Sequence, residues 1–134
     1  MNQDETLILI KPDGIKRGLI GKIISRFEEK GFVIGNIKYL MFTDGDAKIF
    51  YSSHQGKPFF NELVQFITSA PLVACVLKGS NAISVVRTMI GSTKAFEAIP
   101  GTIRGDFGLG ITDNLIHASD SVESFIKESH VIFG

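Results

Sequence analysis

Apolar residues follow different spacings along the chain, and each spacing predicts a type of element. The continuous apolar run over 6–10 ends at the turn residues 11–14 and predicts a buried central strand. Apolar residues at helical spacing over 20–27, followed by Gly31 as a C-terminal cap, predict a helix of about ten residues. Alternation over 37–42 predicts a second strand, with both faces largely apolar.

The middle of the chain predicts short helices before a third strand. Thr43 is expected to cap a helix that has Asp46 in its first turn, and a second short helix is expected over 61–69. The apolar run over 72–77 lies between a proline and a glycine and predicts another buried strand. Apolar residues three or four positions apart over 83–90 then predict a helix.

The last third of the chain begins with a glycine-rich segment. Residues 91–110 show little periodicity, and a loop of this length in a small domain is typical of a functional segment. Residues 115–117 are expected to form a short last strand. Asp120 at the N-cap and Glu123 three residues later resemble a capping box, which predicts a helix with residues 125 and 126 facing inward.

The order of these elements predicts the fold class. Strands and helices alternate in a way that fits an α+β protein, a ferredoxin-like α/β sandwich with a four-stranded antiparallel sheet covered by helices. The chain of 134 residues is expected to form a single domain over 1–134. The pattern alone leaves the order of the strands in the sheet open.

Composition and charge narrow the function classes. Hydrophobic residues make up 44% and charged residues 21%, and 14 basic residues balance 14 acidic ones, which argues against a protein that coats nucleic acid. The single cysteine, Cys75, lies in an apolar run and is expected to be buried in a reducing compartment. The polar, acidic N-terminus is unlike a signal peptide, and no apolar run is long enough for a membrane helix. A cytoplasmic protein without a membrane or nucleic-acid partner is therefore expected.

Three cationic residues stand at the ends of predicted elements or in the long loop: Lys11, Arg87 and Arg104. Each alone would usually be a solvated surface charge, but together near one histidine they would suit phosphate oxygens. The glycine-rich fingerprints of P-loop and Rossmann proteins do not occur in the sequence. A P-loop or Rossmann mechanism is therefore disfavoured.

His117 is the strongest candidate for a nucleophile. Because the histidine side chain is largely neutral near pH 7, one ring nitrogen offers a lone pair without an activating base. A carboxylate from Glu128 could orient the ring if the last helix folds back beside the strand. The position of His117 alone would more often indicate a structural histidine. His54 and His130 look like ordinary loop and terminal histidines.

Three motifs together resemble the nucleoside diphosphate kinase family. They are Lys11-Pro12-Asp13, Pro100-Gly101-Thr102-Ile103-Arg104-Gly105-Asp106-Phe107 and Asn114-Leu115-Ile116-His117-Ala118-Ser119-Asp120-Ser121. The resemblance runs from Thr6 almost to the end of the chain, and the order and spacing of the motifs make it highly specific. It implies a ping-pong transfer of the γ-phosphoryl group of a nucleoside triphosphate, typically ATP, to a diphosphate through a phosphohistidine at the δ nitrogen of His117.

The resemblance also implies roles for other residues. Glu128 and Ser119 would hold the ring of His117. Contacts to phosphates and sugar hydroxyls are implied for Lys11, Tyr51, Arg87, Thr93, Arg104 and Asn114, of which Lys11 and Tyr51 also count among the catalytic residues. Phe59 would stack on the base, and Leu63 and Ile111 would line that cleft. Mg²⁺ would be held mainly by the nucleotide phosphates and water, without a protein metal site.

Stacking on Phe59 predicts broad base specificity, because every base has a π-face.

Without the resemblance, several of these residues have ordinary structural interpretations. Phe59 could belong to the core, Thr93 and Asn114 could be turn and cap residues, and Tyr51 could be a half-buried helix residue.

The sequence departs from the family pattern at three positions. Ala118 replaces the usual glycine and adds a methyl group beside the nucleophile, a change expected to be tolerated. Lys94 and Ala95 replace the common Asn-Pro and could loosen the long loop. Family members assemble as hexamers or tetramers, so a homo-oligomer is expected here.

Two other function classes stay open at this point. One is a phosphohistidine carrier that passes its phosphoryl group to protein partners, although a carrier needs no base or sugar site. The other is a ferredoxin-like binding module without catalysis, which would form no covalent intermediate. The leading hypothesis is an enzyme whose substrates are nucleoside di- and triphosphates.

Overall fold

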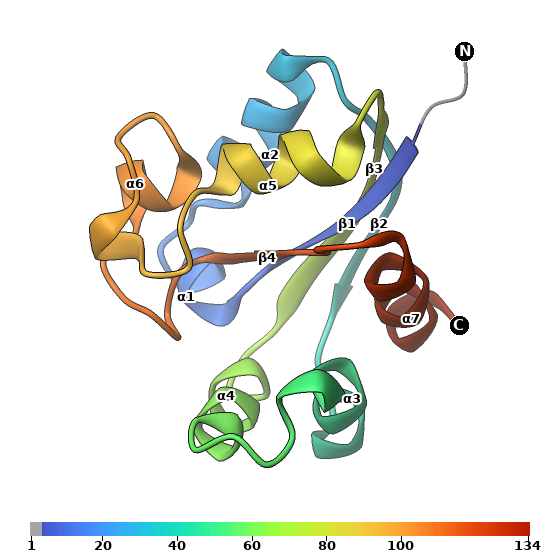
Figure 1. Ribbon diagram of the computed structural model, residues 1–134, viewed down its shortest axis with the longest axis vertical. Helices are drawn as coiled ribbons and strands as arrows, with labels where there is room; N and C mark the ends of the chain where they lie inside the picture. The colour runs from blue at the N-terminus through green and yellow to red at the C-terminus, as the bar shows by residue number, and fades with distance from the viewer. Residues whose placement is uncertain (1–3) are drawn as a thin grey trace.

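A four-stranded antiparallel sheet forms the centre of the computed structural model, which describes residues 4–134 (Figure 1). The strands are β1 (Asp4–Ile10), β2 (Val33–Leu40), β3 (Leu72–Gly79) and β4 (Ile116–Ala118), in the spatial order β2-β3-β1-β4. The α-helices are α1 (Pro12–Lys16), α2 (Ile20–Lys30), α3 (Asp44–Phe50), α4 (Phe60–Ile67), α5 (Ala82–Ile90), α6 (Ile103–Phe107) and α7 (Val122–Phe133). Two short 3₁₀ turns are η1 (Ser52–His54) and η2 (Ala95–Glu97). The predicted α+β, ferredoxin-like sandwich is confirmed.

Helices cover both faces of the sheet. Helices α2 and α5 lie on one face, and α3, α4 and α7 lie on the other (Figure 1). Successive residues of β1 therefore point into different cores: Ile8 and Ile10 toward α2 and α5, Leu7 and Leu9 toward the other helices. All four side chains are completely buried, which explains why this strand is a continuous apolar run.

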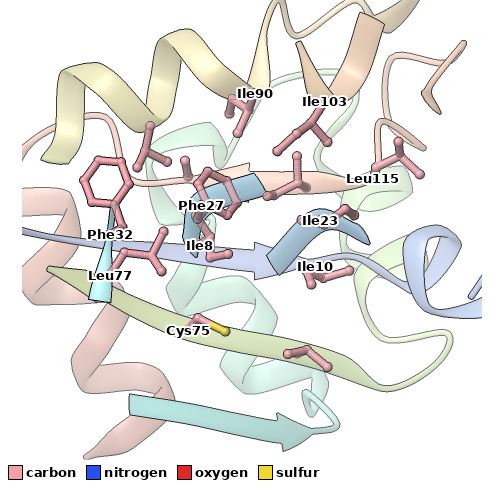
Figure 2. Close-up of a cluster of buried hydrophobic side chains, with 14 of the residues drawn as sticks. Ile8, Ile10, Ile23, Phe27, Phe32, Cys75, Leu77, Ile90, Ile103 and Leu115 are labelled. Atoms are coloured by element: carbon pink, nitrogen blue, oxygen red, sulfur yellow. The ribbon is translucent and has the colours of Figure 1, made fainter. Parts of the chain in front are cut away.

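The core between the sheet and helices α2 and α5 is built from large aliphatic and aromatic side chains (Figure 2). Ile23 and Phe27 of α2 and Ile90 of α5 are fully buried there. Cys75 of β3 belongs to the same cluster, and the prediction that this cysteine is buried is confirmed. Burial raises the pKa of the Cys75 thiol to about 11, so the thiol stays protonated at neutral pH.

Local capping signals in the first half of the chain are confirmed. Thr43 Oγ1 accepts a hydrogen bond from the backbone N–H of Asp46 at 3.1 Å, and the Asp46 carboxylate accepts one from the Thr43 backbone at 3.2 Å. This reciprocal pair starts α3. Gly31 ends α2 with a φ of 114°, a conformation that favours glycine.

The second strand differs from its prediction. It covers Val33–Leu40 instead of 37–42, and Val33, Ile37 and Tyr39 are more than half exposed. No residue of this strand is fully buried, so its apolar alternation does not report two buried faces. The strand lies at the edge of the sheet, with a hydrogen-bonded neighbour on one side only. Phe42 lies beyond the strand and packs on Phe50 of α3, with ring centroids 5.3 Å apart.

The segment 91–110, predicted as a loop, contains η2 and α6. Thr102 caps α6, and its Oγ1 accepts a hydrogen bond from the backbone N–H of Gly105 at 3.0 Å. Helix α6 has only 5 residues, which is too short to give a recognisable periodicity in sequence.

The last helix also begins differently from the prediction. Its N-cap is Ser121, whose Oγ accepts a hydrogen bond from the backbone N–H of Ser124, and not Asp120. Asp120 instead accepts a hydrogen bond from the Ser124 hydroxyl. Ile126, predicted to face inward, is 62% exposed, because Glu128 and Ile132 occupy the buried face of α7.

Helices long and apolar enough to cross a membrane do not occur in the described part of the chain.

Candidate active site

His117 lies in β4, which pairs with β1 and begins one residue later than predicted. Its neighbours Ile116 and Ala118 point into the core beneath α2 and α5. The alternation of the strand therefore directs His117 to the opposite face, toward α3 and α7. There the ring packs on Phe50 and Tyr51, with centroid distances of 5.0 and 6.2 Å.

A carboxylate on α7 holds one nitrogen of this ring. Nε2 of His117 lies 3.0 Å from Oε1 of Glu128, and the same oxygen accepts a hydrogen bond from the Ser119 hydroxyl at 2.7 Å. Because a carboxylate only accepts hydrogen bonds, Nε2 carries the proton and Nδ1 of the neutral ring keeps its lone pair. The predicted association of His117, Ser119 and Glu128 is present in the fold, with Ser119 fully buried and Glu128 only 5% exposed.

Tyr51 contributes a buried hydroxyl next to the histidine. The side chain is 4% exposed, and its hydroxyl has no hydrogen-bond partner among the described residues. Burial and the negative charge of Glu128 raise the pKa of Tyr51 well above its usual value, so the hydroxyl remains protonated. It is therefore available as a hydrogen-bond donor to a ligand.

Lys11, at the end of β1, is a nearly buried cation. Its Nζ donates hydrogen bonds to Oδ1 of Asn114 at 2.8 Å and to the carbonyl of Thr112 at 3.3 Å. Burial, followed by the positive charge of Arg104, lowers the pKa of Lys11 to about 7. The amine is thus poised to gain a full charge when an anion arrives.

Arg104 on α6 is the second buried cation, at 4% exposure. Its guanidinium donates hydrogen bonds to the backbone carbonyls of Gly91, Asn114 and Ile116, at distances of 3.0, 3.3 and 2.6 Å. A guanidinium has more N–H donors than these three bonds use, so some remain for a ligand. Burial, followed by the charge of Arg87, lowers the pKa of Arg104 to about 10.

Asn114 and Arg87 connect further predicted residues to this group. The amide nitrogen of Asn114 donates a hydrogen bond to the carbonyl of Thr93 at 2.8 Å. Arg87 is exposed on α5, and its Nη1 donates a hydrogen bond to the carbonyl of Ala118 at 3.1 Å. Five predicted residues from different elements thus meet around the histidine strand, namely Lys11, Arg87, Thr93, Arg104 and Asn114.

The turn before β4 depends on Asp13, to which the sequence assigned no individual role. Leu115 has a φ of 76°, a conformation rarely adopted by residues with side chains. Its N–H donates to the Asp13 carboxylate at 3.0 Å, and its carbonyl accepts from the backbone of Lys11 at 2.8 Å. Lys11 and the first residues of α1 therefore fix the strained residue that separates Asn114 from β4.

The predicted base-stacking residue lies on the other side of Tyr51. Phe59 is 44% exposed, and its ring centroid lies 5.5 Å from that of His54, which in turn lies 6.1 Å from that of Tyr51. His54, interpreted from the sequence as an ordinary loop histidine, thus links the two aromatic residues. Leu63 is largely buried and Ile111 is 51% exposed, and both lie outside the hydrogen-bonded group.

A metal site built from protein side chains does not occur within residues 4–134, where no three His, Cys, Asp or Glu residues are grouped to hold an ion. The site instead presents cations and neutral donors. This donor set fits an anionic ligand that brings its own counter-ion.

Comparisons with known proteins agree with this chemistry. A family model described as nucleoside diphosphate kinase matches residues 4–134. The chain is 58% identical to a nucleoside diphosphate kinase of Staphylothermus marinus, over 99% of this chain and 94% of the relative. It is 55% identical to one of Thermoplasma volcanium, over 97% of this chain and 88% of the relative.

Solved structures give the same result. A nucleoside diphosphate kinase of Aquifex aeolicus superposes with a TM-score of 0.95 at 44% identity, covering 98% of this chain and 96% of that chain. A halophilic one from Halobacterium salinarum, in complex with CDP, also gives 0.95, at 42% identity, covering 98% of this chain and 88% of that chain.

The environment of Lys11 predicts a pH-dependent stability. Because burial lowers its pKa from 10.5 to about 7, the unfolded chain binds more protons between these values than the folded one. We expect the unfolding free energy of the wild type, relative to Lys11→Met, to rise with pH through this window and to level off above it. Urea unfolding of both proteins at several pH values measures the difference, and a pH-independent difference would contradict the buried-amine assignment.

Proposed function

The chain belongs to the nucleoside diphosphate kinase family and is a phosphotransferase, and we propose that it works by a ping-pong cycle through a phosphohistidine on His117. The observation that carries this proposal is the contact between Nε2 of His117 and Glu128, which leaves Nδ1 as the nucleophilic nitrogen. The Ser119 hydroxyl supports the orientation of the carboxylate.

In the first half-reaction, the lone pair of Nδ1 attacks the γ-phosphorus of a nucleoside triphosphate. The bond between this phosphorus and the β–γ bridging oxygen breaks, and the diphosphate leaves with the electron pair. In the second half-reaction, a terminal oxygen of another diphosphate attacks the phosphorus, and the P–N bond electrons return to Nδ1. Both half-reactions use the same site because donor and acceptor differ only in the transferred group.

The buried cations suit the charge of this reaction. Phosphoryl transfer depends mainly on positioning and on electrostatic stabilisation of the transferred group. We propose that Lys11 and Arg104 provide this stabilisation, together with the Tyr51 hydroxyl, and that Arg87, Thr93 and Asn114 contact phosphates or sugar hydroxyls. Mg²⁺, held mainly by the nucleotide phosphates and water, would neutralise further phosphate charge.

Base recognition is proposed to rest on Phe59, with Leu63 and Ile111 beside it. Stacking on a ring does not distinguish the bases, so purine and pyrimidine nucleotides should both be substrates. The CDP complex of the Halobacterium salinarum relative, which holds a pyrimidine nucleotide, supports this proposal.

A labelling and chase experiment tests the phosphohistidine. Brief incubation with γ-labelled ATP and magnesium should give an acid-labile, base-stable phosphoprotein, and unlabelled GDP should empty it into GTP. The label should be absent in His117→Ala. Label that no nucleoside diphosphate can discharge would indicate a phosphoryl carrier, and an intact protein that binds nucleotide but takes up no label would contradict the catalytic proposal.

Substitution of Phe59 tests base recognition. Because stacking is worth about 1–3 kcal/mol for any base, Phe59→Ala should raise KM by a similar factor for purine and pyrimidine diphosphates. Phe96→Ala, at an exposed phenylalanine of η2, is the matched control and should leave KM unchanged. Steady-state kinetics with four diphosphates measures both, and a large loss confined to one base would refute stacking as the general mode of binding.

We also propose that the chain forms a homo-oligomer, a hexamer or tetramer as the family resemblance implies. The edge strand β2 supports this, since Ile37 and Tyr39 expose 57% and 64% of their surface along an unpaired strand edge. Sedimentation of the wild type should give an oligomer, and Tyr39→Asp should shift it toward smaller species. A monomeric wild type would contradict the proposal.

A further inference from the structure

Arg26 on α2 contacts the segment that carries Arg104 at three points. Its Nη2 lies 2.6 Å from Oδ2 of Asp106, and its Nη1 donates a hydrogen bond to the carbonyl of Gly101 at 3.1 Å. The guanidinium carbon lies 4.9 Å from the centroid of the Phe107 ring. One side chain of α2 therefore contacts one residue that precedes Arg104 in the chain, Gly101, and two that follow it, Asp106 and Phe107.

These contacts form a closed ring. The other Asp106 oxygen, Oδ1, accepts a hydrogen bond from the backbone N–H of Gly101 at 2.8 Å. Arg26 thus bonds to both Asp106 and Gly101, which also bond to each other. The N–H of Gly101 and the Arg26 guanidinium hold the pKa of the Asp106 carboxyl below its usual value, so the ring stays charged throughout the neutral range.

The ring is mechanically connected to Arg104. Helix α6 is a single short helical segment, in which Asp106 follows Arg104 by two residues. Its first turn is closely packed, because a side chain at Gly105 would place Cβ 2.0 Å from the carbonyl oxygen of Ile99. A displacement of Asp106 or Gly101 would therefore move the backbone of Arg104 with them.

We propose that Arg26 is a positioning residue for phosphoryl transfer, because its ring with Asp106 and Gly101 holds α6 where the Arg104 guanidinium meets the phosphates. This inference rests on the proposed function. Arg26 touches no other residue of the candidate site by hydrogen bond or ion pair within the described chain, so it acts through Arg104.

The simpler alternative is an ordinary surface ion pair. The side chains of Arg26 and Asp106 are 29% and 28% exposed, and exposed pairs contribute little to stability on their own. A purely stabilising pair would change the unfolding midpoint and leave the kinetics of the folded enzyme unchanged. A positioning pair changes the kinetics even where every variant is fully folded.

The test compares Arg26→Met with Lys22→Met, a matched variant at an exposed position of the same helix. Steady-state kinetics are measured well below the unfolding midpoint of each protein. Arg26→Met should lower kcat/KM by about tenfold, since small misplacements of positioned groups are costly to rate. Lys22→Met should stay within about twofold of the wild type. Asp106→Asn, which removes the charge from the other side of the ring, should reproduce the loss.

A double-mutant cycle identifies the route of the effect. In an Arg104→Lys background, Arg26→Met should cause much less than its usual loss of kcat/KM, because the group that it positions is already changed. Arg26→Lys keeps the charge but cannot bridge both Asp106 and Gly101 as a guanidinium does, so it should recover only part of the activity.

Two results would overturn the inference, and they differ from failure of the proposed function. Unchanged kcat/KM in Arg26→Met, with normal wild-type turnover, would leave the kinase intact and remove the role of Arg26. A full tenfold loss that persists in the Arg104→Lys background would show that Arg26 does not act through Arg104. A wild type that transfers no phosphoryl group would instead refute the proposed function and the inference with it.

Discussion

Burial of positive charge without a carboxylate partner is the constraint on which the site depends. Lys11 and Arg104 are each about 95% buried, yet the only ion pair between a lysine or arginine and a carboxylate within residues 4–134 is Arg26–Asp106. An isolated buried charge is strongly unfavourable, and hydrogen bonds to carbonyl and amide oxygens offset only part of that cost. The part of the desolvation cost that is not offset lowers the pKa of both residues. An anionic ligand such as a nucleotide phosphate would offset this remaining cost, so the fold is complementary to its proposed substrate in charge.

The backbone around the cations is arranged to supply those oxygens. Arg104 uses the carbonyls of Gly91, Asn114 and Ile116, and Lys11 uses that of Thr112 with the side chain of Asn114. The carbonyls of Gly91, Thr112 and Asn114 lie outside the regular strands and helices, in which hydrogen bonds within the element would occupy them, and that of Ile116 lies in β4 at the edge of the sheet. The irregular conformation from 108 to 115, including the positive φ of Leu115, leaves the carbonyls of Thr112 and Asn114 able to accept hydrogen bonds from the two cations.

The sheet also places the proposed nucleophile, which has to stay partly exposed to react with a ligand. Strand β4 is short, and its alternation puts Ile116 and Ala118 into the core while His117 keeps 20% of its side-chain surface exposed. Glu128 approaches from α7, so the ring is fixed by a helix on one side and by Phe50 and Tyr51, at the end of α3, on the other. The extra methyl group of Ala118 is accommodated because it is fully buried in the core facing away from the histidine side.

The sequence by itself determined the central strand, the Thr43 and Gly31 caps, the fold class and the set of motif residues around His117, since these depend on local propensity, on periodicity or on motif spacing. It misplaced β2, α6 and the start of α7, where an edge strand and a five-residue helix give weak periodic signals. Only the tertiary structure decided the strand order, the nitrogen of His117 that faces Glu128, the support of Leu115 by Asp13, and the ring that joins Arg26 to Asp106 and Gly101. Periodicity reports whether a side chain is buried but not which distant residue buries it, and Arg26 and Gly101 are 75 positions apart in the chain.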